Sequence, residues 1–397
     1  MSNRIATPVP SYAGDIFSTE GIHNPYPHYR KIRDLGGAVW LPQYSLFAVS
    51  RYEDVKRALA DTSTFISGRG IAVSDEMNAM LTDSIITSDG PAHMVIRKRE
   101  AAPLLPQSLD PLRAFVRNEA DALVRRLTAE SEFDAMADLA AHLPLTIVAE
   151  LVGLPPDGRE NMMQWSAAIF QLIGPMNDLS QAALADCQEM FEFVQSVNPD
   201  TVKPGSWADR IFSLVRAGEI DREKAGKMLV DLIGPALDST YFGIGNMIRL
   251  LGENPGQWDQ VRQHVEFVSA TVNETLRLES PIRGFTRFTA DEATVGDIVV
   301  PKDSRVLLLY ASANRDERYW GADSETMNIR RPDVGRQIAF GFGRHSCLGM
   351  HLARLEMSAI LEAMIRHVSA IAVADAEPAT ITSLRGLTRM RTSFVTA

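Results

Sequence analysis

The stretch FGFGRHSCLG, residues 340–349, decides how this sequence folds and what it does. Its three glycines favour a tight turn of the backbone. The apolar spacing of residues 348–367, directly after Cys347, predicts an amphipathic helix. A cysteine at a helix N-terminus lies near free N–H groups and the positive end of the helix dipole, which favours the thiolate. Such a thiolate is a strong donor to iron, although an incidental thiol in a glycine-rich turn is the alternative.

Five positions in this stretch match the pattern FxxGx(H/R)xCxG, and the stretch resembles the heme-binding signature of the cytochromes P450. The resemblance implies heme b, iron protoporphyrin IX, with Cys347 as the axial metal ligand. It also implies that the phenylalanine shields the sulfur side of the porphyrin and that the histidine holds a propionate. The implied cofactor-binding residues of the loop are Phe340, Gly341, His345, Cys347 and Gly349.

Other basic residues match further heme contacts of the same family. The segment SDGPAH, residues 88–93, followed by Arg97, resembles the family's DPPxHxxxR segment. His93 and Arg97 lie one helical turn apart, so both can point at one anionic group, and the resemblance implies a heme propionate. Arg287 stands in the place of a third propionate-binding residue. Polar residues that cap a helix are the alternative for the first pair.

Glu274 and Arg277 lie three residues apart in a predicted helix, so they share one face and can form an ion pair. This pair resembles the ExxR motif of the cytochromes P450, which is structural. We therefore expect it to stabilise the core on the heme side and to have no catalytic role.

The segment GPALDST, residues 234–240, is predicted to lie within a helix. Pro235 removes one backbone hydrogen bond, and the Ser239 hydroxyl could bond back to the Pro235 carbonyl. The segment resembles the oxygen-binding groove (A/G)GxDT, with Pro235 and Ala236 at the first two positions and Ser239 in place of threonine. The resemblance implies that proton delivery depends on the catalytic residues Asp238, Ser239 and Thr240.

Helical spacing dominates the chain from Ala92 to about Leu251, with breaks at Pro103, Pro106, Pro155-Pro156, Gly174-Pro175 and Asn198–Gly205. Short strands are predicted in clusters, and no linker or repeat divides the chain, so an α-rich α+β fold is expected. The resemblance implies the triangular, mostly α P450 fold with small β-sheets, as a single heme domain over residues 1–397. The predicted strands are Ala38–Leu41 with Leu46–Ser50, and Thr294–Val300 with Ser304–Leu309, joined by a turn at Pro301–Asp303.

Composition excludes several classes of protein. A net charge of −10 over 397 residues argues against general affinity for nucleic acid or anionic membranes. No secretory signal and no apolar run of about 18 residues is visible, so a soluble, cytoplasmic protein is expected. The two cysteines, Cys187 and Cys347, exclude a disulfide framework or a multi-cysteine metal site, and Cys187 is expected to be an inert helical thiol.

Within the family the chain most resembles soluble bacterial enzymes that oxidise para-substituted benzoates and related small aromatic acids, in residues 67–75, 169–170, 174–175 and 243–245. Those enzymes hold the substrate carboxylate with an Arg-Ser pair where this chain has Val230 and Asp231. Both an aromatic acid and a neutral or phenolic aromatic therefore remain open. The expected substrate-binding residues are Arg69 and Ser74 as a polar grip, with Ile169, Phe170, Leu237 and Phe285 as apolar lining.

The resemblance implies a monooxygenase that inserts one oxygen atom of O2 into a small aromatic substrate, by hydroxylation or oxidative O-demethylation. Electrons would come from a separate ferredoxin or flavodoxin with its NAD(P)H reductase. A basic docking patch for this donor is expected at Arg344, Lys98, Arg99 and Arg354. A peroxygenase that uses hydrogen peroxide and a non-catalytic heme sensor are the alternatives.

Overall fold

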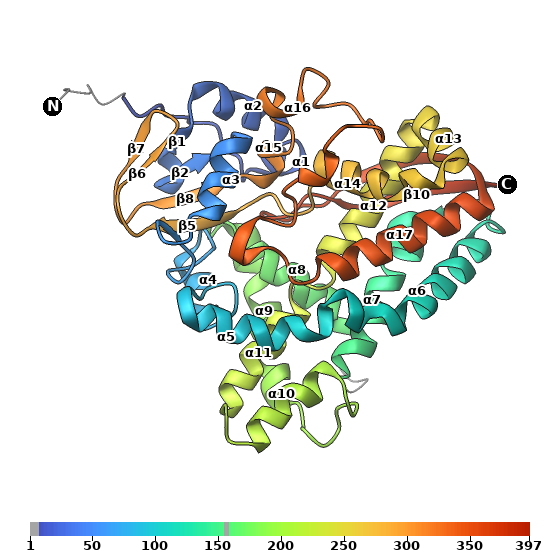
Figure 1. Ribbon diagram of the computed structural model, residues 1–397, viewed down its shortest axis with the longest axis horizontal. Coiled ribbons are helices and arrows are strands. Elements are labelled where there is room, and N and C mark those ends of the chain that lie inside the picture. Colours follow the sequence, from blue (N-terminus) through green and yellow to red (C-terminus); the bar gives the residue numbers. More distant parts are fainter. Residues whose placement is uncertain (1–7, 155–158) are drawn as a thin grey trace.

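The fold was examined in a computed structural model that describes residues 8–154 and 159–397. The expected break at Pro155-Pro156 lies outside the described residues. The molecule is a triangle in which helices occupy most of the area and strands occupy two corners (Figure 1). The longer helices are α5 (Gly90–Ala101), α6 (Pro106–Leu127), α7 (His142–Val152), α8 (Met162–Leu172), α9 (Asp178–Ser196), α10 (Trp207–Arg216), α11 (Arg222–Ile233), α12 (Asp238–Glu253), α13 (Pro255–Gln263), α14 (Val268–Leu278) and α17 (Met350–His367).

The other helices, most of them short, lie mainly around the strands at one corner. That corner holds a five-stranded sheet with strand order β1-β2-β8-β5-β3. The short helices are α1 (Thr19–His23), α2 (Tyr26–Leu35), α3 (Tyr52–Ala60), α4 (Asp75–Met80), α15 (Tyr310–Ala313) and α16 (Glu317–Trp320), and the strands of this sheet are β1 (Ala38–Leu41), β2 (Leu46–Val49), β3 (Phe65–Ile66), β5 (Phe285–Thr289) and β8 (Arg305–Leu308).

The expected hairpin of β1 and β2 is confirmed, with Ala38 opposite Val49. Thr294–Val300 was expected as one strand, and this expectation is wrong. The segment forms a hairpin of its own, β6 (Ala293–Val295) and β7 (Ile298–Val300), because Gly296 adopts a φ of 63° and reverses the chain. The expected partner strand exists as β8, but it pairs with β2 and β5 instead of β7.

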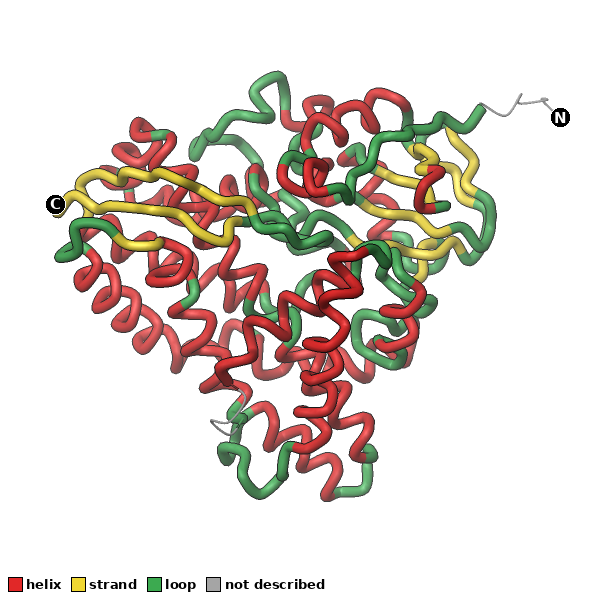
Figure 2. Tube along the Cα trace, turned by 180° about the vertical axis from the view of Figure 1, so that it is seen from behind, coloured by secondary structure: helices red, strands yellow, loops and turns green. Residues whose placement is uncertain are grey.

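The second corner is closed by the C-terminal hairpin of β9 (Val368–Pro378) and β10 (Leu387–Thr396), which also pairs with β4 (Phe133–Asp134). Figure 2 shows this hairpin lying along the helical body on the side opposite to the view of Figure 1. Sequence inspection did not predict it. The stretch Ala135–Val152 is apolar enough in length and composition to cross a membrane, but more than half of it is buried inside the fold. This burial is typical of a core helix.

The predicted pair of Glu274 and Arg277 is completely buried in the helical core. Two parallel hydrogen bonds of 2.7 and 2.8 Å join the guanidinium to the carboxylate, and Arg331 donates to the same carboxylate at 3.1 Å. Arg277 also donates to the backbone carbonyls of Asn314 and Ser324. The pair therefore connects α14 to the residues that follow α15 and to those that follow α16.

The segment 234–240 was expected within one helix, and this expectation is wrong. α11 ends at Ile233, and α12 begins at Asp238. Pro235 has no N–H to donate, and its ring clashes with the preceding turn, so the regular helix stops before it. The four residues between the two helices form a turn, and Pro235 and Ala236 of this turn line the large cavity described below.

Candidate active site

The large cavity of the molecule has a volume of about 250 Å³ and is bordered by both the Cys347 loop and the turn between α11 and α12. Most of its wall is apolar, as is typical of a small-molecule site. Its charged lining side chains fall into two groups. Basic residues come from α5, β5 and the cysteine loop, and acidic residues come from α11 and α17.

The cysteine loop is held by its own backbone. The Cys347 N–H donates to the Phe340 carbonyl at 2.8 Å, and Gly341 and Gly343 have φ angles of 69° and 73°. A side chain at Gly343 would lie 2.9 Å from the carbonyl oxygen of Leu59 on α3, so glycine is required there. The loop thereby brings the Cys347 side chain to the cavity wall.

Backbone N–H groups at the start of α17 contact the Cys347 thiol. Burial raises the pKa of the thiol, while hydrogen bonds from the N–H groups of Gly349 and Met350 and the charges of Arg97 and Arg354 lower it. The expected helix N-terminus is therefore present, with α17 beginning three residues after the cysteine. This environment provides the groups that would stabilise a thiolate bound to a cation.

The four basic residues expected to contact a heme, His93, Arg97, Arg287 and His345, all line the cavity. The rings of His93 and His345 lie 4.2 Å apart, and the buried Nε2 atom of His93 has no hydrogen-bond partner. Burial above all, followed by the nearby His345 and Arg97, lowers the pKa of His93 to about 4. Two guanidinium groups and two imidazoles, one of them with an unpartnered nitrogen, fit a ligand that carries two carboxylates, as heme does.

Ser239 and Thr240 line the cavity, together with Pro235 and Ala236. The Ser239 hydroxyl donates to the Pro235 carbonyl at 3.5 Å, as expected from the sequence, but the bond is long. Asp238 is 2% exposed, lies behind the cavity wall, and its Oδ2 atom has no partner. Burial raises the pKa of Asp238 to about 7, against a lowering hydrogen bond from Ser166.

Of the expected substrate-binding residues, Ile169, Phe170 and Phe285 line the cavity. Leu237 is completely buried but does not line it. The expected polar grip needs a correction, because neither member of that pair reaches the cavity.

Arg69 forms an ion pair with Asp303, and its guanidinium packs on the Phe288 ring at 4.6 Å, with 46% of its side chain exposed. Ser74 is buried elsewhere, where its hydroxyl donates to the Leu172 carbonyl and caps α4. The prediction that these two side chains face the cavity is therefore wrong.

Asp231, which sequence inspection noted, and Glu100, which it did not, form an acidic pair beside the cavity. Asp231 lines the cavity, and its Oδ2 atom accepts the N–H of Ile85 at 2.9 Å. Glu100 is 5% exposed, and neither of its carboxylate oxygens has a partner. A signal was available, because Glu100 follows His93 and Arg97 at helical spacing and so lies on the same face of α5.

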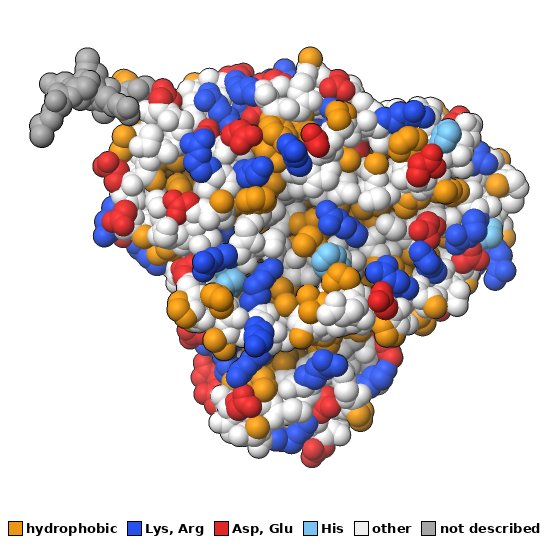
Figure 3. All heavy atoms as spheres, viewed as in Figure 1, with side chains coloured by type: hydrophobic (Ala, Val, Ile, Leu, Met, Phe, Trp, Pro, Cys, Tyr) orange, Lys and Arg blue, Asp and Glu red, His pale blue; other side chains and the backbone are white. Residues whose placement is uncertain are grey.

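The expected basic patch is present only in part. Lys98, Arg99 and Arg344 are exposed. On the face of the molecule seen in Figure 3, Lys and Arg side chains lie among apolar ones over the middle. Arg354 does not join them, because it packs on the Phe340 ring at 5.0 Å and donates to Asn273.

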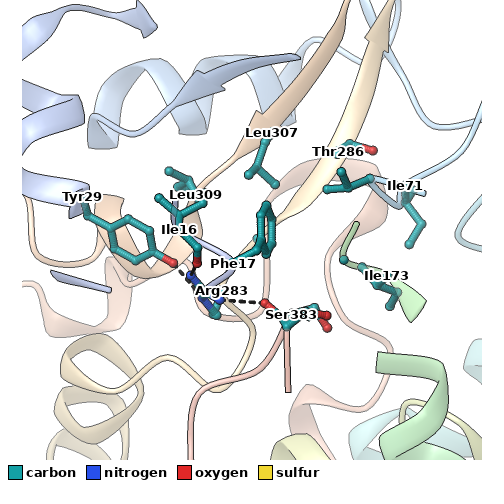
Figure 4. A pocket seen from close by; sticks show the side chains of 14 residues that line it. Ile16, Phe17, Tyr29, Ile71, Ile173, Arg283, Thr286, Leu307, Leu309 and Ser383 are labelled. Atoms are coloured by element: carbon teal, nitrogen blue, oxygen red, sulfur yellow. Dashed lines mark hydrogen bonds between the residues drawn. The ribbon is translucent and has the colours of Figure 1, made fainter. Parts of the chain in front are cut away.

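A second cavity, of about 10 Å³, lies between the N-terminal segment and the strands β5 and β8. Figure 4 shows Arg283 reaching into it towards Tyr29 and Ser383. This guanidinium donates to the Tyr29 hydroxyl and to the carbonyls of Thr382 and Ile16, so it is fully engaged in structure. The volume suffices for about one water molecule and excludes a substrate.

The described fold and the cysteine-bearing cavity define an oxidoreductase of the heme-thiolate class, and comparisons with known proteins agree. The family model "Cytochrome P450" matches residues 12–194 and 248–394. The chain is 32% identical over 371 residues to cytochrome P450 CYP199A2 of Rhodopseudomonas palustris, covering 92% of this chain and 90% of the relative. It is 30% identical to cytochrome P450 144 of Mycobacterium tuberculosis, covering 91% and 87%.

Among solved structures, CYP109Q5 of Chondromyces apiculatus superposes with a TM-score of 0.77 at 25% identity, covering 98% of this chain and 99% of that one. The chain belongs to the cytochrome P450 family. It is a P450 monooxygenase, and its cofactor is heme. The turn between α11 and α12 lies within residues 195–247, outside the matched ranges.

Proposed function

We propose that this chain, as one heme domain over residues 1–397, oxidises small aromatic molecules at the large cavity, by hydroxylation or oxidative O-demethylation. The observation that carries the proposal is that Cys347 and the Ser239-Thr240 pair line the same largely apolar cavity. In the net reaction, O2, two electrons and two protons convert R–H to R–OH and water. An aryl methyl ether instead loses its methyl group as formaldehyde.

The heme, when bound, supplies the redox chemistry that activates dioxygen. Cys347 would hold the iron, because its side chain lines the cavity and accepts hydrogen bonds from the N–H groups of Gly349 and Met350. The proposed propionate contacts are the basic residues of the lining, and the remaining loop residues shape the cysteine side of the porphyrin site. These residues are His93, Arg97, Arg287 and His345, with Phe340, Gly341 and Gly349.

Asp238, Ser239 and Thr240 are the proposed proton-delivery residues. Because burial raises the pKa of Asp238 to about 7, this carboxyl can both hold and release a proton near neutrality. The hydroxyls of Ser239 and Thr240 lie on the cavity wall, where they can pass that proton to the reacting region.

The proposed substrate is a small aromatic, because Ile169, Phe170 and Phe285 give the cavity wall an apolar and partly aromatic lining. A separate ferredoxin or flavodoxin with its NAD(P)H reductase is the proposed electron donor. An acidic donor is complementary to the exposed Lys98, Arg99 and Arg344. We further infer a soluble, cytoplasmic protein, in keeping with the buried position of its most apolar helical stretch.

The test uses purified holoenzyme with a ferredoxin, its reductase and NADH. Neutral para-substituted aromatics such as 4-methoxytoluene are expected to shift the heme from low to high spin and to stimulate NADH consumption with formation of an oxidised product. Turnover with hydrogen peroxide but not with the reductase system would identify a peroxygenase. Absence of any substrate-stimulated NADH consumption would identify a heme sensor.

A further inference from the structure

Asp231 lies one helical turn before the proposed reaction region. It lies on α11 four residues before Pro235, which follows the end of that helix, and four helical residues correspond to about 6 Å along a helix axis. Both residues line the cavity. A molecule about one para-substituted ring in length can therefore contact Asp231 at one end and reach the Ser239 region with the other.

Asp231 is close to a second acid. Glu100 on α5 is buried, has no hydrogen-bond partner on either oxygen, and interacts electrostatically with Asp231. Burial raises the pKa of both carboxyls. For Glu100, repulsion from the Asp231 carboxylate raises the pKa further. The groups facing the pair are the N–H of Ile85, the hydroxyl of Ser84 and the ammonium of Lys224.

No buried cation neutralises the pair among the described residues. Lys224 is partly exposed and donates to the backbone carbonyl of Asp83. The basic side chains of the cavity lining, His93, Arg97, Arg287 and His345, belong to the proposed propionate site, and Arg69 is engaged with Asp303. Asp231 therefore faces the cavity with Glu100 beside it. Among the described residues neither carboxylate forms an ion pair, and Lys224 acts on them only through its charge.

Two neighbouring carboxyls that share one proton carry a single negative charge. Burying that charge without a partner is costly, and a cationic ligand that enters the cavity removes most of this cost. A carboxylate ligand would instead add a second negative charge and be repelled. The charge distribution thus opposes the benzoate substrates that the sequence resemblance suggests.

We propose that the substrate is a small aromatic amine whose ammonium group binds the Asp231 carboxylate, with Glu100 supporting the charge. The assignment rests on the proposed monooxygenase function and names the substrate class of that same cavity. The ammonium end is fixed at α11, which directs the opposite para substituent towards the heme.

The experiment compares three matched ligands that differ only in the polar group opposite the methoxy substituent: 4-methoxybenzylamine, 4-methoxybenzyl alcohol and 4-methoxybenzoate. Dissociation constants are measured by calorimetry and by the heme spin shift in wild-type holoenzyme and in D231N, E100Q and D83N. The amide introduced by D231N retains an oxygen that can accept the Ile85 N–H, so the loop should stay in place. Asp83 lies outside the cavity lining, and its positive φ is compatible with asparagine, so D83N is the matched control.

In wild type the amine is expected to bind about 10- to 100-fold more tightly than the alcohol, and the benzoate most weakly. D231N should remove this preference, E100Q should reduce it, and D83N should leave it unchanged. Alcohol binding should stay within about threefold of wild type in each variant, which verifies an intact cavity. If the amine binds no more tightly than the alcohol, or if D231N leaves its affinity unchanged, the assignment is wrong.

The two proposals fail in different ways. Oxidation of the alcohol or of another neutral ether, without any preference for the amine, would overturn only the substrate class. Failure of every aromatic to bind or to be oxidised would overturn the proposed function and the assignment together.

Discussion

The Nη2 atom of Arg97 donates a hydrogen bond of 2.6 Å to the backbone carbonyl oxygen of Ser346, the residue directly before Cys347. The bond joins α5 to the cysteine loop across 249 residues of sequence. Both partners also line the cavity. Arg97 thus positions the loop that carries the proposed iron ligand, in addition to its proposed contact with a propionate.

Replacement of Arg97 by glutamine should weaken heme binding by about 10- to 100-fold, because a charged hydrogen bond of this kind contributes about 1.5–3 kcal/mol. Heme titration of the apoprotein, followed by absorbance, measures the change. R99Q is the control, since Arg99 lies on the same helix but is exposed and pairs with Glu219. Equal heme affinities in R97Q and R99Q would contradict the prediction.

Replacement of Cys347 by histidine should abolish the red-shifted Soret band that the ferrous–CO complex shows when a thiolate ligates the iron. The carbon monoxide difference spectrum measures this directly. C187A should keep the band, because Cys187 is completely buried and burial raises its pKa to about 12. A thiolate band that survives in C347H would refute the assignment of the ligand.

Replacement of Asp238 by asparagine should slow turnover by about 10²–10⁴-fold with little change in substrate binding, since a positioned proton donor is lost. Replacement of Ser239 by alanine should divert electrons into hydrogen peroxide. Turnover, peroxide yield and the substrate dissociation constant are measured together. If both variants keep the wild-type rate and coupling, these residues do not take part in proton delivery.

Replacement of Glu274 by alanine should lower the free energy of unfolding by about 3–5 kcal/mol, because it leaves the buried Arg277 without its carboxylate and removes one of the two carboxylates that Arg331 contacts. D110A is the control. Asp110 and Arg113 form an exposed pair, whose loss should cost less than about 1 kcal/mol. Urea unfolding of both variants tests the difference, and similar losses would contradict it.

Glu356 gives a prediction for the pH dependence of stability. Burial raises its pKa from 4.5 to about 8, and its Oε2 atom has no partner. Above pH 4.5 the unfolded chain releases this proton while the folded chain retains it, so stability falls as the pH rises towards 8. At pH 7 the free energy of unfolding is lower by about 3 kcal/mol than it would be below pH 4.5.

E356Q should remove this loss and should therefore melt at a higher temperature than wild type at pH 8, with little difference at pH 5. E362Q, on a partly exposed part of the same helix, serves as the control. Thermal unfolding at both pH values provides the measurement. An identical pH profile for E356Q and wild type would show that Glu356 does not titrate in this way.

The sequence predicted features that depend on close spacing along the chain. The cysteine loop, the pair of Glu274 and Arg277, and the hairpin of β1 and β2 all involve partners that local geometry brings together. The wrong predictions concern side chains whose direction is set by distant partners. Arg69 turns to Asp303, 234 residues away, and no local pattern encodes that contact.

The same reason explains why Glu100 was missed as the partner of Asp231. The two residues belong to different helices, α5 and α11, and only the tertiary fold brings their charges together. The break between α11 and α12 was partly foreseen, because Pro235 was recognised as a distortion. Whether a proline kinks a helix or ends it depends on how the surrounding residues pack, and the spacing of apolar residues does not reveal that packing.

Two side chains, Ile71 and Ile173, border both the large cavity and the small one beside Arg283. Shortening them would join the two spaces and let a bulkier molecule extend towards the N-terminal segment. Each such change in a packed core costs about 2–5 kcal/mol, a large share of the stability of most folded proteins. In evolution, a broader substrate range should therefore arise first in lineages in which this protein is already more stable than folding requires.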